Sequence, residues 1–320
     1  MGSTRHREPG TLVDHPVWQD HDPSPFCLAL EGGAMRCQFT AGVLDCMLDR
    51  GLLAQLVVGV SAGAAVGFSY ASGATGRSCY MNMKYAGDWR FFSLRSRLLT
   101  GSTYGGPFIF DTIPNKLEHI DYSWFGESPI RFVSVASCLE DGQAAYHEFD
   151  DSMDVKRGSD CLVASTSMPL VSAPVLIDGK HYLDGGICDS IPFDYARREY
   201  ARMLEVQEDS ADKVPKQVIV LSRPREHRLC IDRIIELERR RYRKWPRFIE
   251  ACERRLAMHN AQYDEIERMH DAGEAYAIWP EHPIEVGMME KNPDKLLAAW
   301  AQGYEQMSRQ WAEIERYLKR

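Results

Sequence analysis

The chain has 320 residues, of which 44% are hydrophobic and 26% carry a charged side chain, and this mixture excludes a largely disordered protein. Its formal net charge is −8, which excludes a general nucleic-acid-binding protein because phosphate backbones require a basic face. No stretch reaches the roughly 18 consecutive apolar residues that a membrane-spanning helix needs.

The first 75 residues alternate between predicted strands and helices. Residues 1–25 are polar and contain no secretory signal, so we expect a flexible N-terminal arm. The apolar run FCLALE (26–31) predicts a buried strand, and the helix-spaced apolar residues after it end at Gly51. LVVGV (56–60) predicts a second buried strand, and the small residues after Ser61 favour a helix. This alternation is typical of a parallel α/β sheet.

The rest of the chain changes character after residue 222. Three further apolar segments predict strands, at residues 130–137, 181–184 and 217–222. Beyond them the sequence is charged and helix-periodic, and residues 293–319 predict an amphipathic helix. We therefore expect a flexible arm over residues 1–25, one α/β domain over 26–222, and a helical C-terminal extension over 223–320 that packs on the core.

Nine cysteines are spread between Cys27 and Cys252, and no two have CxxC spacing. Several lie inside apolar runs, as expected for reduced core residues rather than for a disulfide frame or a metal site. We therefore expect a cytoplasmic protein without a bound metal.

The segment GVSAG places Ser61 between a predicted strand and a predicted helix. A G-x-S-x-G motif in this context is typical of a nucleophile elbow, in which a sharp turn exposes the serine hydroxyl. Gly59 and Gly63 remove side chains that would clash in such a turn. A tight packing turn is the alternative interpretation, and the strand before and helix after Ser61 disfavour it.

A second glycine-rich turn, GGAMRC, follows the first strand. Successive backbone N–H groups of Gly32 and Gly33 at a strand-to-helix junction can bind an anion, such as the oxyanion of an acyl-transfer reaction. Arg36 adds a positive charge one turn later. A nucleotide-binding loop is disfavoured because neither GxGxxG nor GxxxxGK[ST] is present.

The partner that would accept the serine proton is less obvious. His227, His259, His270 and His282 follow Ser61 late enough for an α/β-hydrolase. His227 lies in a basic loop, His282 has no predicted strand before it, and the charged helices around His259 and His270 favour solvated surface positions. Asp184 ends a predicted strand and precedes Gly185 and Gly186, in HYLDGG. Burial would raise the pKa of Asp184 and make it a better base, although Asp-Gly-Gly is also a common turn.

GGAMRC, GVSAG and DGG, in this order, resemble the motifs of the patatin-like phospholipases over about residues 26–222. The resemblance implies a three-layer α/β/α fold with a mainly parallel central sheet. It also implies a serine–aspartate dyad without histidine or cofactor, acting on lipid carboxylic esters through an acyl-enzyme. By this resemblance the candidate site comprises the nucleophile Ser61, the proton acceptor Asp184, the oxyanion residues Gly32, Gly33, Ala34 and Arg36, the elbow glycines Gly59 and Gly63, and the supporting turn Gly185 and Gly186.

Two residues depart from the family pattern GGGxRG. Ala34 replaces the third glycine and Cys37 replaces the glycine after the arginine. An alanine held at positive φ is strained by about 1 kcal/mol. Two alternatives to the dyad enzyme therefore stay open: a histidine-dependent esterase, and a catalytically weak patatin-like binding protein.

Two other segments bear on lipid binding. Residues 88–110 are aromatic, basic and interrupted by glycines, and predict either a lid over an acyl groove or core packing. The basic stretch RRRYRKWPR (239–247) is typical of a solvated helix face, with peripheral contact to anionic lipid as the alternative. The expected partner is thus a lipid or ester substrate and no nucleic acid, and no oligomeric state is indicated.

Overall fold

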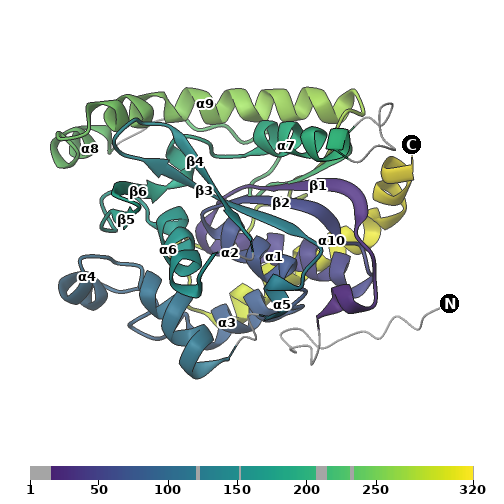
Figure 1. Cartoon of the computed structure of the whole chain (residues 1–320), viewed down its shortest axis with the longest axis horizontal. Coiled ribbons are helices and arrows are strands. Elements are labelled where there is room, and N and C mark those ends of the chain that lie inside the picture. The colour runs from purple at the N-terminus through teal and green to yellow at the C-terminus, as the bar shows by residue number, and fades with distance from the viewer. Residues whose placement is uncertain (1–15, 120–122, 151–152, 207–214, 231–233, 320) are drawn as a thin grey trace.

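The computed structural model describes residues 16–119, 123–150, 153–206, 215–230 and 234–319. A sheet of eight strands lies at its centre, in the order β5-β6-β3-β2-β1-β7-β8, with β4 also paired to β3 (Figure 1). Five strands are mutually parallel: β1 (Ser24–Leu30), β2 (Ala54–Val60), β3 (Arg131–Cys138), β7 (Gln217–Val220) and β8 (Tyr276–Ile278). The antiparallel pairings are those of β4 (Ala144–Phe149) and β6 (Lys180–Asp184) with β3, and that of β5 (Val175–Ile177) with β6.

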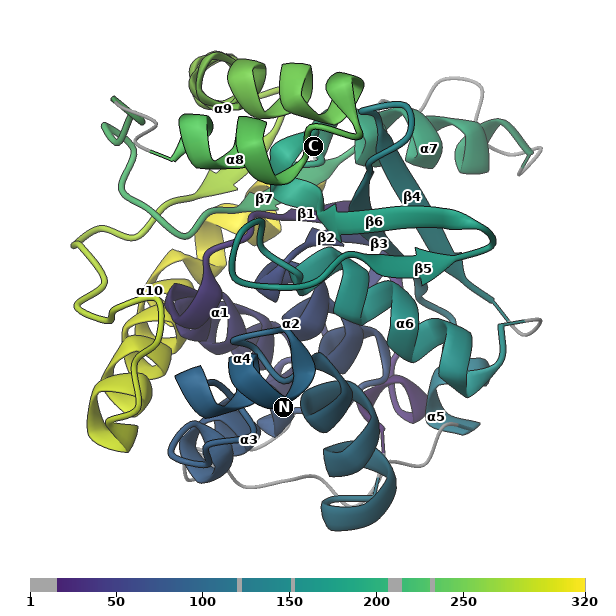
Figure 2. The same ribbon diagram turned by 90° about the vertical axis from the view of Figure 1, so that its left-hand side faces the viewer.

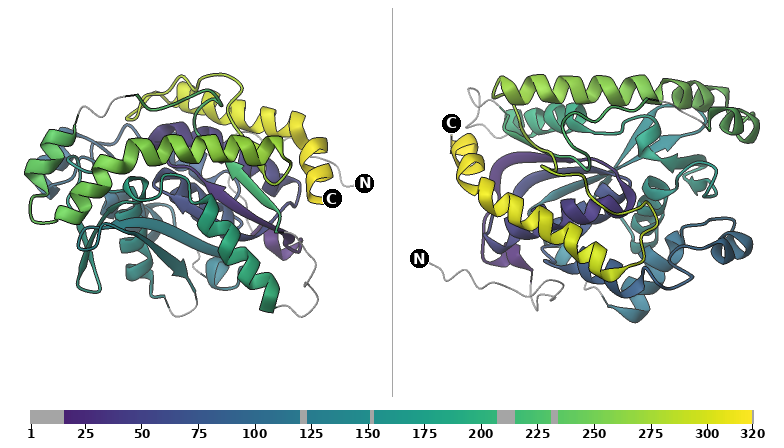
Figure 3. Two further views of the ribbon diagram at one scale, coloured as in Figure 1. Left: turned by 90° about the horizontal axis from the view of Figure 1, so that it is seen from above. Right: turned by 180° about the vertical axis from the view of Figure 1, so that it is seen from behind.

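Helices cover both faces of this sheet. One face carries α1 (Cys37–Asp49), α2 (Ala62–Ala71), α6 (Val155–Thr166) and α10 (Pro293–Lys319), and the other carries α7 (Phe193–Val206) and α9 (Pro246–Asp271) (Figures 1 and 3). The remaining helices are α3 (Arg77–Tyr85), α4 (Leu94–Thr100), the π-helix η3 (Phe108–Leu117), α5 (Ser123–Gly126), α8 (Ile235–Arg241) and the short 3-10 turns η1 (Val17–Gln19), η2 (Ala34–Arg36) and η4 (Gly185–Ile187). The prediction of a three-layer α/β/α fold with a mainly parallel sheet is confirmed.

The strands predicted from the sequence differ from those of the structure in several places. Ser24 and Pro25, assigned above to the N-terminal arm, belong to β1, because Ser24 pairs with Ala54 of β2. The strands β4, β5 and β8 were not predicted. The short strand β8 lies in the charged C-terminal region, where its three residues give too little periodicity to stand out. The arm residues 1–15 lie outside the described part of the chain.

The C-terminal region is built into all three layers. The helix α9 covers one face, β8 extends the sheet beside β7, and α10 packs against α1 on the opposite face. The two helices α1 and α10 cross at glycines: a Cβ on Gly42 would lie 1.9 Å from the carbonyl oxygen of Trp300, and a Cβ on Gly303 would lie 2.0 Å from that of Phe39. Trp300 also donates an indole hydrogen bond of 2.7 Å to Asp45.

Among the helices of the described residues, none combines the length and apolarity needed to cross a membrane. All nine cysteines are free; seven are buried, Cys188 is partly buried and Cys230 is exposed.

Candidate active site

Ser61 lies at a sharp turn where β2 passes into α2. Its backbone angles, φ 55° and ψ −130°, place a non-glycine residue in the sparsely populated positive-φ region. The turn is closed tightly by its glycines. A Cβ on Gly59 would lie 2.7 Å from the Gly63 carbonyl oxygen, and a Cβ on Gly63 would lie 2.6 Å from that of Glu31. The local geometry is therefore that of a nucleophile elbow.

The hydroxyl of Ser61 donates a hydrogen bond of 2.6 Å to Oδ2 of Asp184. Asp184 ends β6, and β6 pairs with the end of β3 opposite Ala136. Because β3 is the parallel neighbour of β2, the carboxyl ends of β2 and β3 bring the two side chains together. The other carboxylate oxygen, Oδ1, accepts a hydrogen bond of 2.8 Å from the backbone N–H of Gly186. This bond fixes the rotation of the carboxylate toward Ser61.

The environment of Asp184 makes its carboxylate a better base. The residue is buried, with 6% of its surface exposed. Burial raises its pKa to about 6, and the hydrogen bonds from Ser61 and Gly186 offset part of this rise. At neutral pH the group is a carboxylate whose affinity for a proton exceeds that of a solvated aspartate by about a hundredfold. A Cβ on Gly185 would lie 2.3 Å from the Val135 carbonyl oxygen, so the turn after Asp184 packs directly on β3.

The second glycine turn, here called the glycine loop (residues 32–36), lies against Ser61. A Cβ on Gly32 would lie 2.9 Å from Cβ of Ser61. A Cβ on Gly33 would lie 2.6 Å from the hydroxyl oxygen of Ser222 on the other side. The loop continues through η2 into α1, so its N–H groups lie at the positive end of a helix. Ala34 has φ 49°, and the alanine therefore occupies the left-handed region that favours glycine.

Arg36 and Cys37 follow the loop. Nε of Arg36 is buried and has no hydrogen-bond partner among the described residues. Cys37 is also buried, and its Sγ lies 3.5 Å from the Glu31 carbonyl oxygen. Burial raises the pKa of Cys37 to about 12, so this residue is a protonated thiol and not a competing nucleophile.

Glu31, directly before the glycine loop, anchors the loop to two other elements and was not identified from the sequence. Its carboxylate accepts a hydrogen bond of 2.6 Å from the backbone N–H of Ser222 and one of 3.1 Å from the hydroxyl of Tyr263. Nε2 of His259 lies 3.3 Å from the other oxygen of Glu31. The Ser222 hydroxyl donates a further bond of 2.9 Å to the Gly32 carbonyl oxygen. Burial raises the pKa of Glu31, but the hydrogen bonds from His259 and Ser222 outweigh it and leave the pKa below its usual value.

The expectation that His259 is a solvated surface residue is wrong. Only 5% of its surface is exposed, because it lies on the face of α9 that packs on the sheet, one turn before Tyr263. The sequence did offer one signal: Glu31 ends the apolar run 26–30, and a carboxylate at such a position needs a buried polar partner. The sequence does not indicate that this partner is His259. Another supporting residue, Ser165 on α6, accepts a hydrogen bond of 2.9 Å from the backbone N–H of Ser61.

No histidine of the described residues forms a hydrogen bond with Ser61 or Asp184. His282 is exposed, and its carbonyl oxygen accepts a bond from Gln302. His227 is partly buried beside Arg223, and burial and this arginine lower the pKa of His227. Neither histidine is placed to take a proton from the serine.

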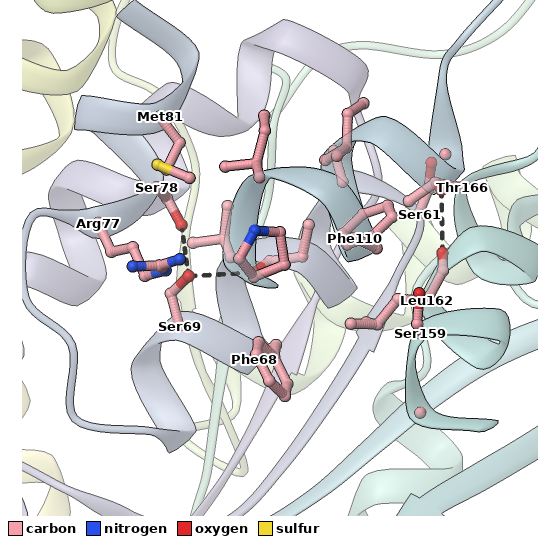
Figure 4. Close-up of a pocket in the computed structure, with 18 of the residues that line it drawn as sticks. Ser61, Phe68, Ser69, Arg77, Ser78, Met81, Phe110, Ser159, Leu162 and Thr166 are labelled. Carbon is pink, nitrogen blue, oxygen red and sulfur yellow. Dashed lines mark hydrogen bonds between the residues drawn. The ribbon is translucent and has the colours of Figure 1, made fainter. Parts of the chain in front are cut away.

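A cavity of about 400 Å³ opens from Ser61 between α2, α6 and η3. Figure 4 shows Ser61 at one end, Phe110 between, and Ser69, Arg77 and Ser78 at the other end. Most of its wall is apolar, with Val66, Phe68, Met81, Phe91, Ile109, Ile113, Phe125, Met153 and Leu162 among the lining residues. At the far end the hydroxyl of Ser78 donates a bond of 3.0 Å to that of Ser69. An apolar cavity with a polar end beside a serine suits an acyl chain.

Residues 88–110 contribute to the core and to the cavity wall, as the core-packing alternative predicts. Phe91 and Phe92 are buried, and Phe91 and Tyr104 line the cavity, whereas α4 between them projects from the molecule (Figure 1). In the basic stretch 239–247, Arg239 pairs with Glu236 and with Glu253, as a solvated helix face predicts.

Comparisons with known proteins indicate the family of the chain. The profile of the family described as patatin-like phospholipase matches residues 28–197, more than half of the chain, and that of a Domain of unknown function (DUF6363) matches residues 245–319. The uncharacterized protein YjjU of Escherichia coli (strain K12) is 28% identical over 200 residues, 58% of this chain and 52% of YjjU. The match thus spans about half the length of that relative. The crystal structure of VipD from Legionella pneumophila aligns with 97% of this chain and 71% of its own, at 12% identity and a TM-score of 0.39.

Proposed function

Because the chain belongs to the patatin-like phospholipase family, we propose that it hydrolyses carboxylic esters of lipids with Ser61 as nucleophile and Asp184 as general base. The family supports lipid acyl hydrolase activity in general. The observation that carries the assignment of the two residues is the 2.6 Å hydrogen bond from Ser61 to a buried Asp184, at a strained elbow beside an apolar cavity.

The acylation half of the reaction uses both residues. Oδ2 of Asp184 accepts the proton of Ser61 while Oγ attacks the ester carbonyl carbon. The carbonyl oxygen becomes an oxyanion, and the backbone N–H groups of Gly33 and Ala34, with Gly32 lining the other side, stabilise it at the start of α1. The protonated Asp184 then donates its proton to the leaving alcohol, and the acyl group remains on Ser61.

Deacylation repeats these steps with water. Asp184 removes a proton from a water molecule, which attacks the acyl-enzyme carbonyl carbon, and the oxyanion forms again at the glycine loop. Collapse of this intermediate breaks the bond to Oγ of Ser61, Asp184 returns the proton to the serine, and a carboxylic acid leaves. The acyl chain occupies the cavity throughout, since its apolar wall begins at Ser61.

Arg36 stabilises the negative charge of the tetrahedral intermediate. Its Nε is buried and has no hydrogen-bond partner among the described residues, so the guanidinium is free to contribute positive charge to the oxyanion at the neighbouring glycine loop. A neutral side chain at position 36 would lower kcat more than it raises KM, because this charge acts mainly in the transition state.

A fluorophosphonate probe and a soluble p-nitrophenyl ester test the proposal together. The wild-type protein should be labelled and should hydrolyse the ester, whereas Ser61→Ala should do neither and still melt cooperatively. Ser308→Ala is a matched control, because this serine lies on α10 and accepts a hydrogen bond from Arg50. A folded wild-type protein that neither reacts with the probe nor turns over the ester would favour the binding-protein alternative, which Ala34 and Cys37 suggested.

A further inference from the structure

The helix α4 forms the tip of a hairpin whose base lines the cavity. Phe92 and Tyr104 form an antiparallel bridge, and the backbone N–H of Ser93 donates a bond of 3.0 Å to the carbonyl of Thr103. A further bond of 2.9 Å joins the N–H of Gly105 to the carbonyl of Phe91. Phe91 and Tyr104 belong to the cavity wall. The cavity and α4 are thus two ends of one short structural unit.

The tip exposes an unusual amount of apolar surface. Leu94, Leu98 and Leu99 have relative exposures of 76%, 87% and 66%, and Trp89 just before the helix has 37%. Ser96 is the only buried residue of α4. The helix starts at an N-cap, where the hydroxyl of Ser93 accepts a bond of 2.9 Å from the N–H of Ser96. Capping, rather than burial of its leucines, stabilises this helix.

A second loop lies against the base of this hairpin and also exposes apolar side chains. Met288 and Met289 are 49% and 53% exposed, and the hydroxyl of Tyr104 donates a bond of 2.7 Å to the Met288 carbonyl oxygen. We call the exposed side chains of Trp89, Leu94, Leu98, Leu99, Met288 and Met289 the apolar tip. Clusters of exposed large apolar side chains on soluble proteins mark interaction sites.

Positive charge accompanies the apolar tip. Arg95 and Arg97 of α4 are exposed, and α4 contains no acidic residue. The guanidinium of Arg95 lies 4.3 Å above the Trp89 ring, and Nζ of Lys291 lies 4.9 Å from the Phe92 ring centre. The nearby carboxylate of Glu290 already accepts hydrogen bonds from the backbone N–H groups of Lys291 and Asn292. Apolar side chains flanked by arginine and lysine match the boundary of an anionic lipid layer.

We propose that the apolar tip docks on the surface of anionic lipid aggregates and thereby brings an acyl chain to the cavity entrance. This inference rests on the proposed function, since it assigns the cavity to an acyl chain. Three observations favour a lipid surface over a second copy of the chain. The leucines are exposed on α4, which lies on the side of the molecule that faces the viewer in Figure 2; Arg95 and Arg97 are exposed on the same short helix; and the same hairpin lines the cavity. The leucines would enter the acyl boundary while Arg95 and Arg97 contact headgroup phosphates.

Vesicle binding tests the proposal without depending on catalysis. All variants are made in the full-length Ser61→Ala protein, and co-flotation is measured with vesicles of phosphatidylcholine alone or mixed with phosphatidylglycerol. Changing Leu94→Asp and Leu98→Asp together should weaken binding by at least about tenfold, because two apolar anchors are replaced by anionic groups. Val206→Asp is the matched control, since Val206 lies at the end of α7 and is 82% exposed.

The charge component has its own test. Changing Arg95→Gln and Arg97→Gln together should lower the preference for vesicles that contain phosphatidylglycerol by about tenfold. Added salt should lower this preference of the parent protein in the same way. Thermal melting shows whether each variant is folded. If the double aspartate variant does not fold, the milder Leu98→Gln replaces it in the flotation experiment.

Unchanged flotation of a folded Leu94→Asp, Leu98→Asp protein would overturn the proposal. So would a loss of binding confined to charge changes in residues 239–247. Sedimentation velocity addresses the second-copy alternative: a dimer that dissociates in the leucine variants, with vesicle binding unaffected, would also overturn it. Because every variant lacks Ser61, these outcomes are independent of whether the serine is the nucleophile.

Discussion

Nε2 of His259 lies 3.3 Å from Oε1 of Glu31, the residue directly before the glycine loop that faces Ser61. The histidine comes from α9, within the region matched by the Domain of unknown function (DUF6363), and the glutamate comes from the patatin-like region. The C-terminal region therefore contacts the elements that build the candidate active site.

Loss of this contact should affect catalysis through the loop. His259→Ala removes one hydrogen-bonding partner of a buried carboxylate, and we expect kcat to fall about tenfold with little change in KM. His259→Gln keeps a donor at this position and should recover part of the loss. Steady-state kinetics on a soluble ester, with melting curves as the folding control, measure both. Wild-type kcat in the alanine variant would show that the loop does not depend on this contact.

The protein should be less stable with alanine at position 34 than with glycine there. At φ 49° the backbone of Ala34 is in the left-handed region, where the Cβ of alanine causes steric strain that glycine avoids. Ala34→Gly should therefore stabilise the protein by up to about 1 kcal/mol and leave activity equal or higher. Ala312→Gly on the exposed part of α10 is the matched control, and there the same change should destabilise by about 1 kcal/mol. Denaturant unfolding compares the two. Destabilisation at both positions would mean that the loop does not hold this conformation.

The fold and the elbow at Ser61 were predictable from local patterns, whereas the choice of Asp184 as its partner came from the resemblance of the motifs to a known family. A nucleophile elbow and a tight turn after a strand both require glycines at fixed positions, and these spacings are local in the chain. Glu31 and His259 are 228 residues apart, and their contact depends on how α9 packs. Local periodicity does not encode such packing. The same holds for β8, whose three residues become a strand because β7 offers a free edge.

Substitutions at successive turns of α2 should limit the length of the acyl chain that the cavity accepts. Ala65 and Ser69 line the cavity one and two turns after Ser61, so they lie about 6 and 12 Å along the helix from it. Ala65→Leu should abolish turnover of long-chain esters and spare only the shortest, whereas Ser69→Leu should spare esters of intermediate length too. A chain-length series of p-nitrophenyl esters measures this. Equal effects of both changes on every ester would place the acyl chain elsewhere.

The ionised carboxylate of Asp184 should lower the free energy of unfolding at neutral pH. Burial raises its folded pKa to about 6, above the value of about 3.9 for an unfolded chain, so ionisation between these values disfavours the folded state. Asp184→Asn should therefore raise the free energy of unfolding at pH 8 by up to about 3 kcal/mol, and the gain should disappear near pH 4. Unfolding at both pH values measures it. A gain that is independent of pH would argue against a raised pKa.

The pH dependence of fluorophosphonate labelling tests the Ser61–Asp184 dyad most directly. Only the carboxylate form of Asp184 accepts the serine proton, so the labelling rate of the wild-type protein should rise with pH through about 6 and level off above it. Asp184→Asn should be labelled on the order of a hundredfold more slowly, and Ser61→Ala not at all. Labelling of Asp184→Asn at the wild-type rate, or a rise with pH that a histidine substitution abolishes, would contradict the dyad.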